Sequence, residues 1–123
     1  MGLFFTDNKS NFDWINLNSS EQLNEIIEQS NESAVLLFKH STRCSISSMA
    51  KSRFEKEWKL DNKVCQTYYL DLITFRPISN EIAEKTGVEH QSPQVIVLKN
   101  KEVIYQASHN GIDANEIQAL FKK

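Results

Sequence analysis

The apolar segment Ala34-Val35-Leu36-Leu37-Phe38 stands shortly before Cys44-Ser45-Ile46-Ser47. An apolar run without alternation is typical of a strand that is covered on both faces in a parallel sheet. Apolar residues at helical spacing after Cys44 predict a helix that ends near Trp58. Cys44 therefore falls between a buried strand and a helix, where unpaired N–H groups and the helix dipole favour a reactive thiolate. The residues expected on the inward face of this helix are Ile46, Met49, Ala50, Phe54 and Trp58.

A second feature is Ser92-Pro93, which precedes the apolar run Val95-Ile96-Val97-Leu98. A proline just before a strand can hold a cis peptide bond and present the neighbouring backbone to an extended thiol substrate. The alternative is an ordinary trans proline at the first residue of a strand. Together with Cys44, the proline indicates thiol–disulfide chemistry.

Composition limits the class of protein. The 123 residues, of which 40% are hydrophobic and 24% charged, predict one globular domain over residues 1–123. The net charge is −2 and acidic and basic residues are interleaved, which excludes nucleic acid as the main partner. Met1-Gly2-Leu3-Phe4-Phe5-Thr6 has no positively charged leader and only a short apolar run. We therefore expect a cytoplasmic protein without a membrane partner.

Apolar runs that alternate with helical patterns predict the element order βαβαβαββα. Strands are expected near residues 14–17, 34–38, 65–71, 94–98 and 102–107, and helices near 19–30, 44–58, 77–86 and from 113 onward. Ser19 with Gln22, and Asp113 with Glu116, have capping-box spacing. Gly87 suits a left-handed helix end. The residues expected to face inward from the last helix are Ile117, Leu120 and Phe121.

Parallel βαβ units, a hairpin at Asn100-Lys101 and a last helix give a mixed five-stranded sheet with helices on both faces, an α/β architecture. This is the order of the thioredoxin fold. The segments that match a known family are Lys39-His40-Ser41-Thr42-Arg43-Cys44-Ser45-Ile46-Ser47, Tyr68-Tyr69-Leu70-Asp71-Leu72, Ser92-Pro93-Gln94-Val95 and Ala107-Ser108-His109. On these segments the chain resembles the thioredoxin superfamily over essentially its whole length.

More narrowly, the chain is similar to the bacilliredoxin-type monothiol redox proteins of the bacillithiol system in low-GC Gram-positive bacteria. It has Arg43 and Ser45 where this family usually has threonine and proline. The resemblance implies a thiol–disulfide oxidoreductase that uses bacillithiol as co-substrate, holds no bound cofactor and acts on S-thiolated client proteins.

Cys44 is the expected nucleophile, which as thiolate attacks a mixed disulfide and forms a covalent intermediate. The alternative is a small buried hydrophobic residue at a helix start. Ser47 stands where a dithiol oxidoreductase carries its resolving cysteine, so the site is monothiol. Its hydroxyl could hydrogen-bond the Cys44 thiolate or belong to an ordinary first-turn residue. Cys65 starts the next strand, about 20 Å down the sheet, and is expected in the core because no disulfide spans that distance.

Strand directions place other polar residues on the same edge of the sheet as Cys44. This edge gathers His40, Arg43, Arg76, His90 and His109. A positive potential there would lower the thiol pKa and attract an anionic thiol, and the bacillithiol that the resemblance implies carries a malate group. Gln91, Ser92 and Pro93 would offer backbone and hydroxyl groups to a bound disulfide. Arg43, His40 and His109 are the other expected substrate contacts, with His109 foremost, and solvated loop residues are the alternative.

The same residues bear on three other functions: metal binding, partner binding without catalysis, and peroxidase activity. Metal binding is not expected, because the histidines and cysteines lack paired ligand spacing. The main alternative is a non-catalytic module that binds a protein partner through the groove beside Pro93, with Cys44 as a regulatory thiol. A peroxidase is a weaker alternative, since a threonine is expected at the position of Ser41 in such a site.

Overall fold

The computed structural model describes residues 12–121 and confirms the expected element order, with a short 3₁₀ helix added after the last strand. The expectations on residues 1–6 lie outside the described range. The elements are β1 (Ile15–Asn16), α1 (Ser20–Gln29), β2 (Ala34–His40), α2 (Ser45–Glu57), β3 (Cys65–Asp71), α3 (Arg76–Thr86), β4 (Gln94–Lys99), β5 (Glu102–Ser108), η1 (His109–Gly111) and α4 (Ala114–Ala119).

The sheet has the strand order β1-β3-β2-β4-β5, with β2 at its centre. Strands β1, β3 and β2 are parallel, and β4 and β5 run antiparallel to their neighbours. Along the β2–β3 pair, Ala34 lies opposite Cys65 and His40 lies opposite Asp71. This mixed five-stranded sheet with helices is the α/β architecture that the sequence predicts.

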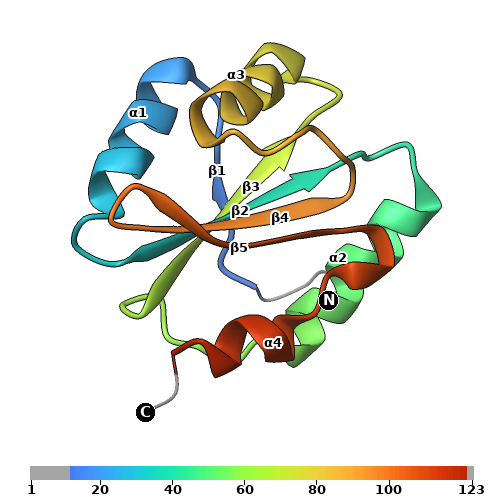
Figure 1. Ribbon diagram of the computed structural model, residues 1–123. Helices are drawn as coiled ribbons and strands as arrows, with labels where there is room; N and C mark the ends of the chain where they lie inside the picture. Colours follow the sequence, from blue (N-terminus) through green and yellow to red (C-terminus); the bar gives the residue numbers. More distant parts are fainter. Residues whose placement is uncertain (1–11, 122–123) are drawn as a thin grey trace, which may run out of the picture.

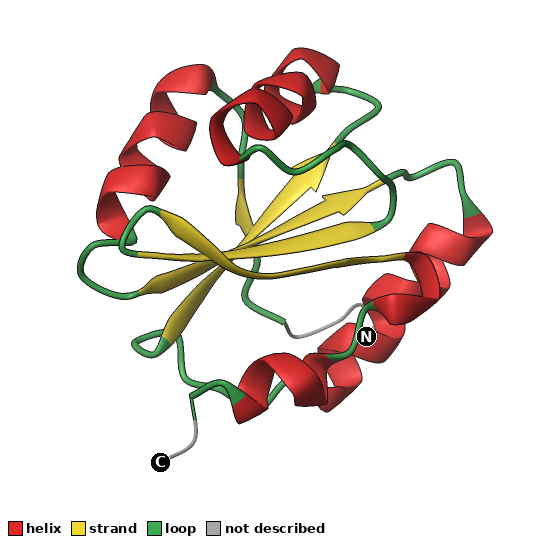
Figure 2. Cartoon of the chain, in the orientation of Figure 1, coloured by secondary structure: helices red, strands yellow, loops and turns green. Residues whose placement is uncertain are grey.

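Helices cover the sheet on both faces (Figure 1). Helices α1 and α3 lie on one face, and α2 and α4 lie on the other, so that the strands form the middle layer (Figure 2). Along β2, Val35 and Leu37 pack under α1 and α3, whereas Leu36 and Phe38 pack under α2 and α4. All seven residues of β2 are buried, including the polar ones at its end.

The helices and the hairpin begin and end at the residues whose local sequence predicts these boundaries. The Ser19 side chain accepts a hydrogen bond from the Gln22 N–H at the start of α1, and Asp113 caps α4 in the same way. Helix α3 ends at Gly87 with a left-handed φ of 75°. Asn100 and Lys101 have φ values of 55° and 65°, the pattern of a two-residue hairpin turn between β4 and β5.

Three apolar residues that were expected to face inward are exposed instead. Ile46 and Met49 of α2 are 57% and 69% exposed, and Leu120 is 48% exposed. In α2 the inward face consists of Ser47, Ala50 and Phe54, so the first-turn position that contacts the sheet belongs to a serine. Leu120 lies at the end of α4, beyond the turn that packs on the sheet. The expectation for Ile46, Met49 and Leu120 was therefore wrong, while Ala50, Phe54 and Ile117 are buried as expected.

Gly87→Ala should lower the free energy of unfolding by about 1 kcal/mol, because an L side chain disfavours the left-handed φ at this position. No heavy atom lies within 4 Å of the added Cβ, so the cost is confined to the backbone. Gly111→Ala is the matched control, since its Cβ would make an ordinary 3.9 Å contact with the Ala107 Cβ. Urea unfolding of both variants checks this, and equal losses would contradict the assignment.

Candidate active site around Cys44

Cys44 is the N-cap residue of α2, in an extended conformation with φ −112° and ψ 119°. Its N–H donates to the Ser41 carbonyl at 3.2 Å, and its carbonyl accepts the Ser48 N–H at 3.1 Å. The residue is half-buried, and within the described chain its thiol makes no capping hydrogen bond. The backbone of Cys44 is thus held in the loop-to-helix junction, and the residue remains partly exposed.

Cys65 is the opposite case. It is wholly buried at the start of β3, where it pairs with Ala34 at the far end of the sheet from His40 and Cys44. Burial raises the pKa of the Cys65 thiol to about 12, so that it remains protonated at physiological pH. The expectation that Cys65 belongs to the core is confirmed.

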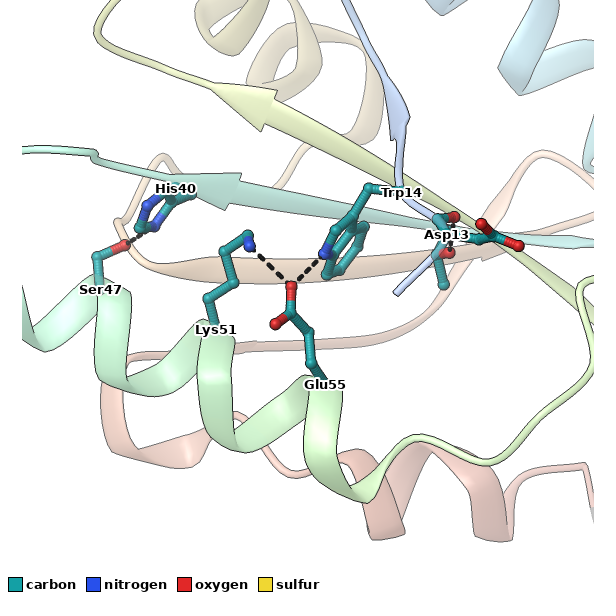
Figure 3. A network of polar contacts seen from close by, with 7 residues as sticks. Asp13, Trp14, His40, Ser47, Lys51 and Glu55 are labelled. Atoms are coloured by element: carbon teal, nitrogen blue, oxygen red, sulfur yellow. Dashed lines mark hydrogen bonds and ion pairs between the residues drawn. The ribbon is translucent and has the colours of Figure 1, made fainter. Parts of the chain in front are cut away.

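The Ser47 hydroxyl lies inside the molecule, against the end of β2. Its Oγ is 2.7 Å from His40 Nδ1 and accepts the Ser41 N–H at 3.1 Å. Ser47 is 0% exposed and His40 is 6% exposed, so both contacts are shielded from water. Ser47 therefore joins the strand, the loop before Cys44 and the first turn of α2 (Figure 3). The expected contact with the Cys44 thiolate is not among its hydrogen bonds in the described chain.

His40 lies on the face of the sheet under α2, and Trp14, Lys51 and Glu55 form a separate group of polar contacts on that face (Figure 3). The ring centroid of His40 is 5.7 Å from that of Tyr69, and the Lys51 ammonium lies 5.3 Å from the same tyrosine ring. Lys51 pairs with Glu55 at 2.7 Å, and the Trp14 indole N–H donates to the same carboxylate. Burial, with a smaller contribution from Lys51, lowers the pKa of His40. His40 is therefore neutral near pH 7 and does not supply the positive charge expected of it.

The Ser92–Pro93 peptide bond is cis, and Pro93 is buried at the entrance to β4. The Pro93 carbonyl accepts a hydrogen bond from the His109 N–H at 2.9 Å. His109 is exposed and has a left-handed φ of 55°, which is uncommon for a residue with a side chain. The half-buried Ser92 has an Oγ that is shielded from solvent and has no hydrogen-bond partner in the described chain. The start of η1 is thus fastened directly to the proline.

Lys39 was not singled out by the sequence, yet it is wholly buried on the face of the sheet under α3. Its Nζ donates to the Ser79 carbonyl at 3.2 Å and to His90 Nδ1 at 3.3 Å. Burial, followed by the charge of Arg76, lowers the pKa of Lys39 to about 8. Burial and these same two cations also lower the pKa of His90, so its ring is neutral and can accept the hydrogen bond.

Of the remaining predicted residues, Arg43 and Arg76 are exposed and Gln91 is half-buried. His40 and His90 favour the neutral form, and the exposed arginines at this edge are Arg43 and Arg76. Among residues 12–121 no group of histidine, cysteine and acidic side chains is placed to hold a metal ion. No helix in the same range is long and apolar enough to cross a membrane.

Comparison with known proteins identifies the family. A family model described as monothiol bacilliredoxin BrxC matches residues 15–117. The chain belongs to this family. Its members are monothiol redox proteins by name, and here the family match falls on a thioredoxin-like oxidoreductase fold.

Solved structures agree with this fold. A protein with a thioredoxin fold is 31% identical and gives a TM-score of 0.74, with the match covering 88% of this chain and 93% of that one. Thioredoxin of Malassezia sympodialis is 19% identical with a TM-score of 0.65, over 92% of this chain and 91% of its own. Thioredoxin of Trypanosoma brucei brucei is 18% identical with a TM-score of 0.60, over 87% and 84%.

Ser47→Ala should lower the free energy of unfolding by about 1–3 kcal/mol, because it leaves His40 Nδ1 and the Ser41 N–H unpaired inside the protein. Ser48→Ala, at the next and exposed position of α2, is the control and should change stability by less than about 0.5 kcal/mol. Urea unfolding measures both values. Indistinguishable losses would show that the buried contact contributes nothing.

Lys39 should make stability rise with pH. Its pKa is about 8 in the folded protein, against an ordinary 10.5, so between these values only the unfolded chain binds the proton. Stability rises with pH wherever the unfolded state binds more protons. Relative to Lys39→Met, the wild type should gain on the order of 2 kcal/mol between pH 7 and pH 9.5 in urea unfolding.

Lys56→Met serves as the control for this pH dependence. Lys56 is exposed on α2, and its variant should keep the wild-type slope. Parallel pH curves for the wild type and Lys39→Met would contradict the account of Lys39.

Proposed function

We propose that this protein is a cytoplasmic oxidoreductase that removes bacillithiol from mixed disulfides on client proteins, with Cys44 as the only reacting cysteine. The observation that carries the proposal is the contrast between its two thiols. Cys44 is partly exposed at the start of α2, whereas Cys65 is buried in the core, where burial raises its pKa. Membership of a family described as monothiol bacilliredoxin supports the proposal.

The reaction follows from a single nucleophile. The Cys44 thiolate attacks the bacillithiol sulfur of a protein–bacillithiol disulfide, and a new disulfide forms between Cys44 and bacillithiol. The old disulfide breaks, and the client cysteine leaves as a thiolate that takes up a proton. A second thiol, such as free bacillithiol, then attacks the bacillithiol sulfur on Cys44. That step restores the Cys44 thiolate and releases the oxidised small thiol, so the electrons come from the second thiol.

The surroundings of Cys44 support this role. Ser47 cannot form an intramolecular disulfide, so the covalent intermediate persists until a second thiol arrives. Arg43 beside the nucleophile and Arg76 at the start of α3 supply positive charge, which favours approach of the anionic malate group of bacillithiol. The backbone of Gln91 and Ser92 and the exposed His109 complete the proposed substrate contacts, and no bound cofactor is required.

Exposure to bacillithiol disulfide should add one bacillithiol to the wild-type protein, on Cys44, as measured by intact-mass and peptide mass spectrometry. The adduct should be lost in Cys44→Ala and kept in Cys65→Ala, the matched control. Free bacillithiol should then remove the adduct and regenerate the thiol. Labelling at Cys65 alone would contradict the proposed function.

One observation favours a second candidate, a binding module that uses Cys44 as a regulatory thiol. Ile46 and Met49 are apolar and exposed on the first turns of α2, next to Cys44. Their exposure is typical of a surface that contacts a protein partner. A Cys44→Ala variant that retains its partners in a pull-down, together with a wild type that forms the adduct but shows no turnover, would favour the module.

A further inference from the structure

A pair of buried polar side chains lies beneath the loop that leads to Pro93. Lys39 near the end of β2 and Gln94 at the start of β4 are direct cross-strand partners. They are 0% and 1% exposed, although both lie at the strand ends near Cys44. Because β2 and β4 are neighbouring inner strands, the two side chains lie side by side on the same face of the sheet.

Each member of the pair holds a different part of the loop. The Gln94 amide donates to the Glu89 carbonyl at 3.0 Å and accepts the Gln91 N–H at 3.4 Å. Lys39 donates to the ring of His90, the residue between these two, and to the Ser79 carbonyl of α3. The Ser79 hydroxyl lies 3.1 Å from the same ring nitrogen of His90. Three consecutive loop residues are therefore tied to the central strands.

Burial of Lys39 and Gln94 is not the arrangement that would stabilise the fold most. Burying an ammonium group opposes folding, and well-packed apolar side chains often stabilise such a position as well or better. The loop, by contrast, has few apolar anchors of its own, because Glu89 is exposed and His90, Gln91 and Ser92 are half-buried. Without these hydrogen bonds the loop backbone would have many accessible conformations. Substrate binding would then have to fix one of them, and the lost conformational entropy would weaken the affinity.

We propose that Lys39 and Gln94 are positioning residues that hold loop residues 89–91 ready to receive the substrate disulfide, and so set substrate affinity. This inference rests on the proposed function, because the loop is taken to form the wall against which the client disulfide docks. Neither residue contacts the reacting sulfurs in this scheme. Their loss therefore weakens binding and leaves the chemistry of Cys44 intact.

The test compares Lys39→Met and Gln94→Met with Lys99→Met, which removes the same charge at the opposite end of β4. The substrate is a peptide that carries bacillithiol in a mixed disulfide, with free bacillithiol as the second thiol. Each of the first two variants should raise KM about five- to ten-fold with kcat within about two-fold of the wild type. Lys99→Met should leave both constants unchanged.

Two further readouts separate positioning from a general loss of structure. Iodoacetamide reacts with a thiol without binding to the loop at residues 89–92, so it should alkylate Cys44 at the wild-type rate in all variants. Amide hydrogen exchange at Gln91, whose N–H donates to Gln94, should accelerate in both Lys39→Met and Gln94→Met, while the strands keep their protection.

Unchanged KM and unchanged exchange in both variants of an active protein would overturn the inference alone. An equal rise in KM for Lys99→Met would also overturn it, since charge at a distance would then explain the effect. A wild type that shows no activity on the peptide contradicts the proposed function instead.

Discussion

Burial of the whole of β2 is the constraint on which the site depends. The strand has parallel and antiparallel neighbours on its two sides and helices on both faces, so none of its seven residues reaches solvent freely. Its apolar part packs without difficulty, but its last two residues are Lys39 and His40. Buried polar groups must find internal partners, and alternation along the strand sends these two side chains to opposite faces. The end of β2 therefore places the polar side chain of Lys39 under α3 and that of His40 under α2.

Lys39 and His40 determine the structure around Cys44. On one face, His40 binds Ser47 and so fixes the first turn of α2 and the loop that carries the thiol. On the other face, Lys39 binds His90 and α3 and, with Gln94, fixes the loop before Pro93. A single strand thus positions both the loop that carries Cys44 and the loop that leads to Pro93. The orientation of α2 that turns Ser47 inward leaves Ile46 and Met49 on the exposed side of the helix.

The sequence predicted the fold well because the signals for its elements were local. The unbroken apolar run of β2, the cap at Ser19 and the glycine at position 87 each specify backbone geometry within a few residues. Burial in α2 was harder to predict, since helical spacing does not distinguish an apolar residue in the core from one exposed beside a site, and Ile46 and Met49 were misplaced for that reason.

The site was predicted in part for the same reason. Cys44 and Pro93 were found from their places before a helix and before a strand, and the core position of Cys65 follows from strand directions. The partners of side chains on different elements do not follow from either signal. The burial of Lys39 could not be predicted from the sequence, because a lysine after an apolar run usually marks the exposed end of a strand, whereas here the buried strand continues through His40. The contact between His40 and Ser47, and the neutral state that burial imposes on His40, likewise depend on tertiary packing.

The most direct measurement is a crystal structure of this protein with bacillithiol in disulfide linkage to Cys44. The account predicts that the bacillithiol sulfur lies against the backbone of Gln91 and Ser92, with the Lys39–His90 and His40–Ser47 contacts preserved. A bacillithiol group directed away from Pro93, over the outer face of α2, would contradict it.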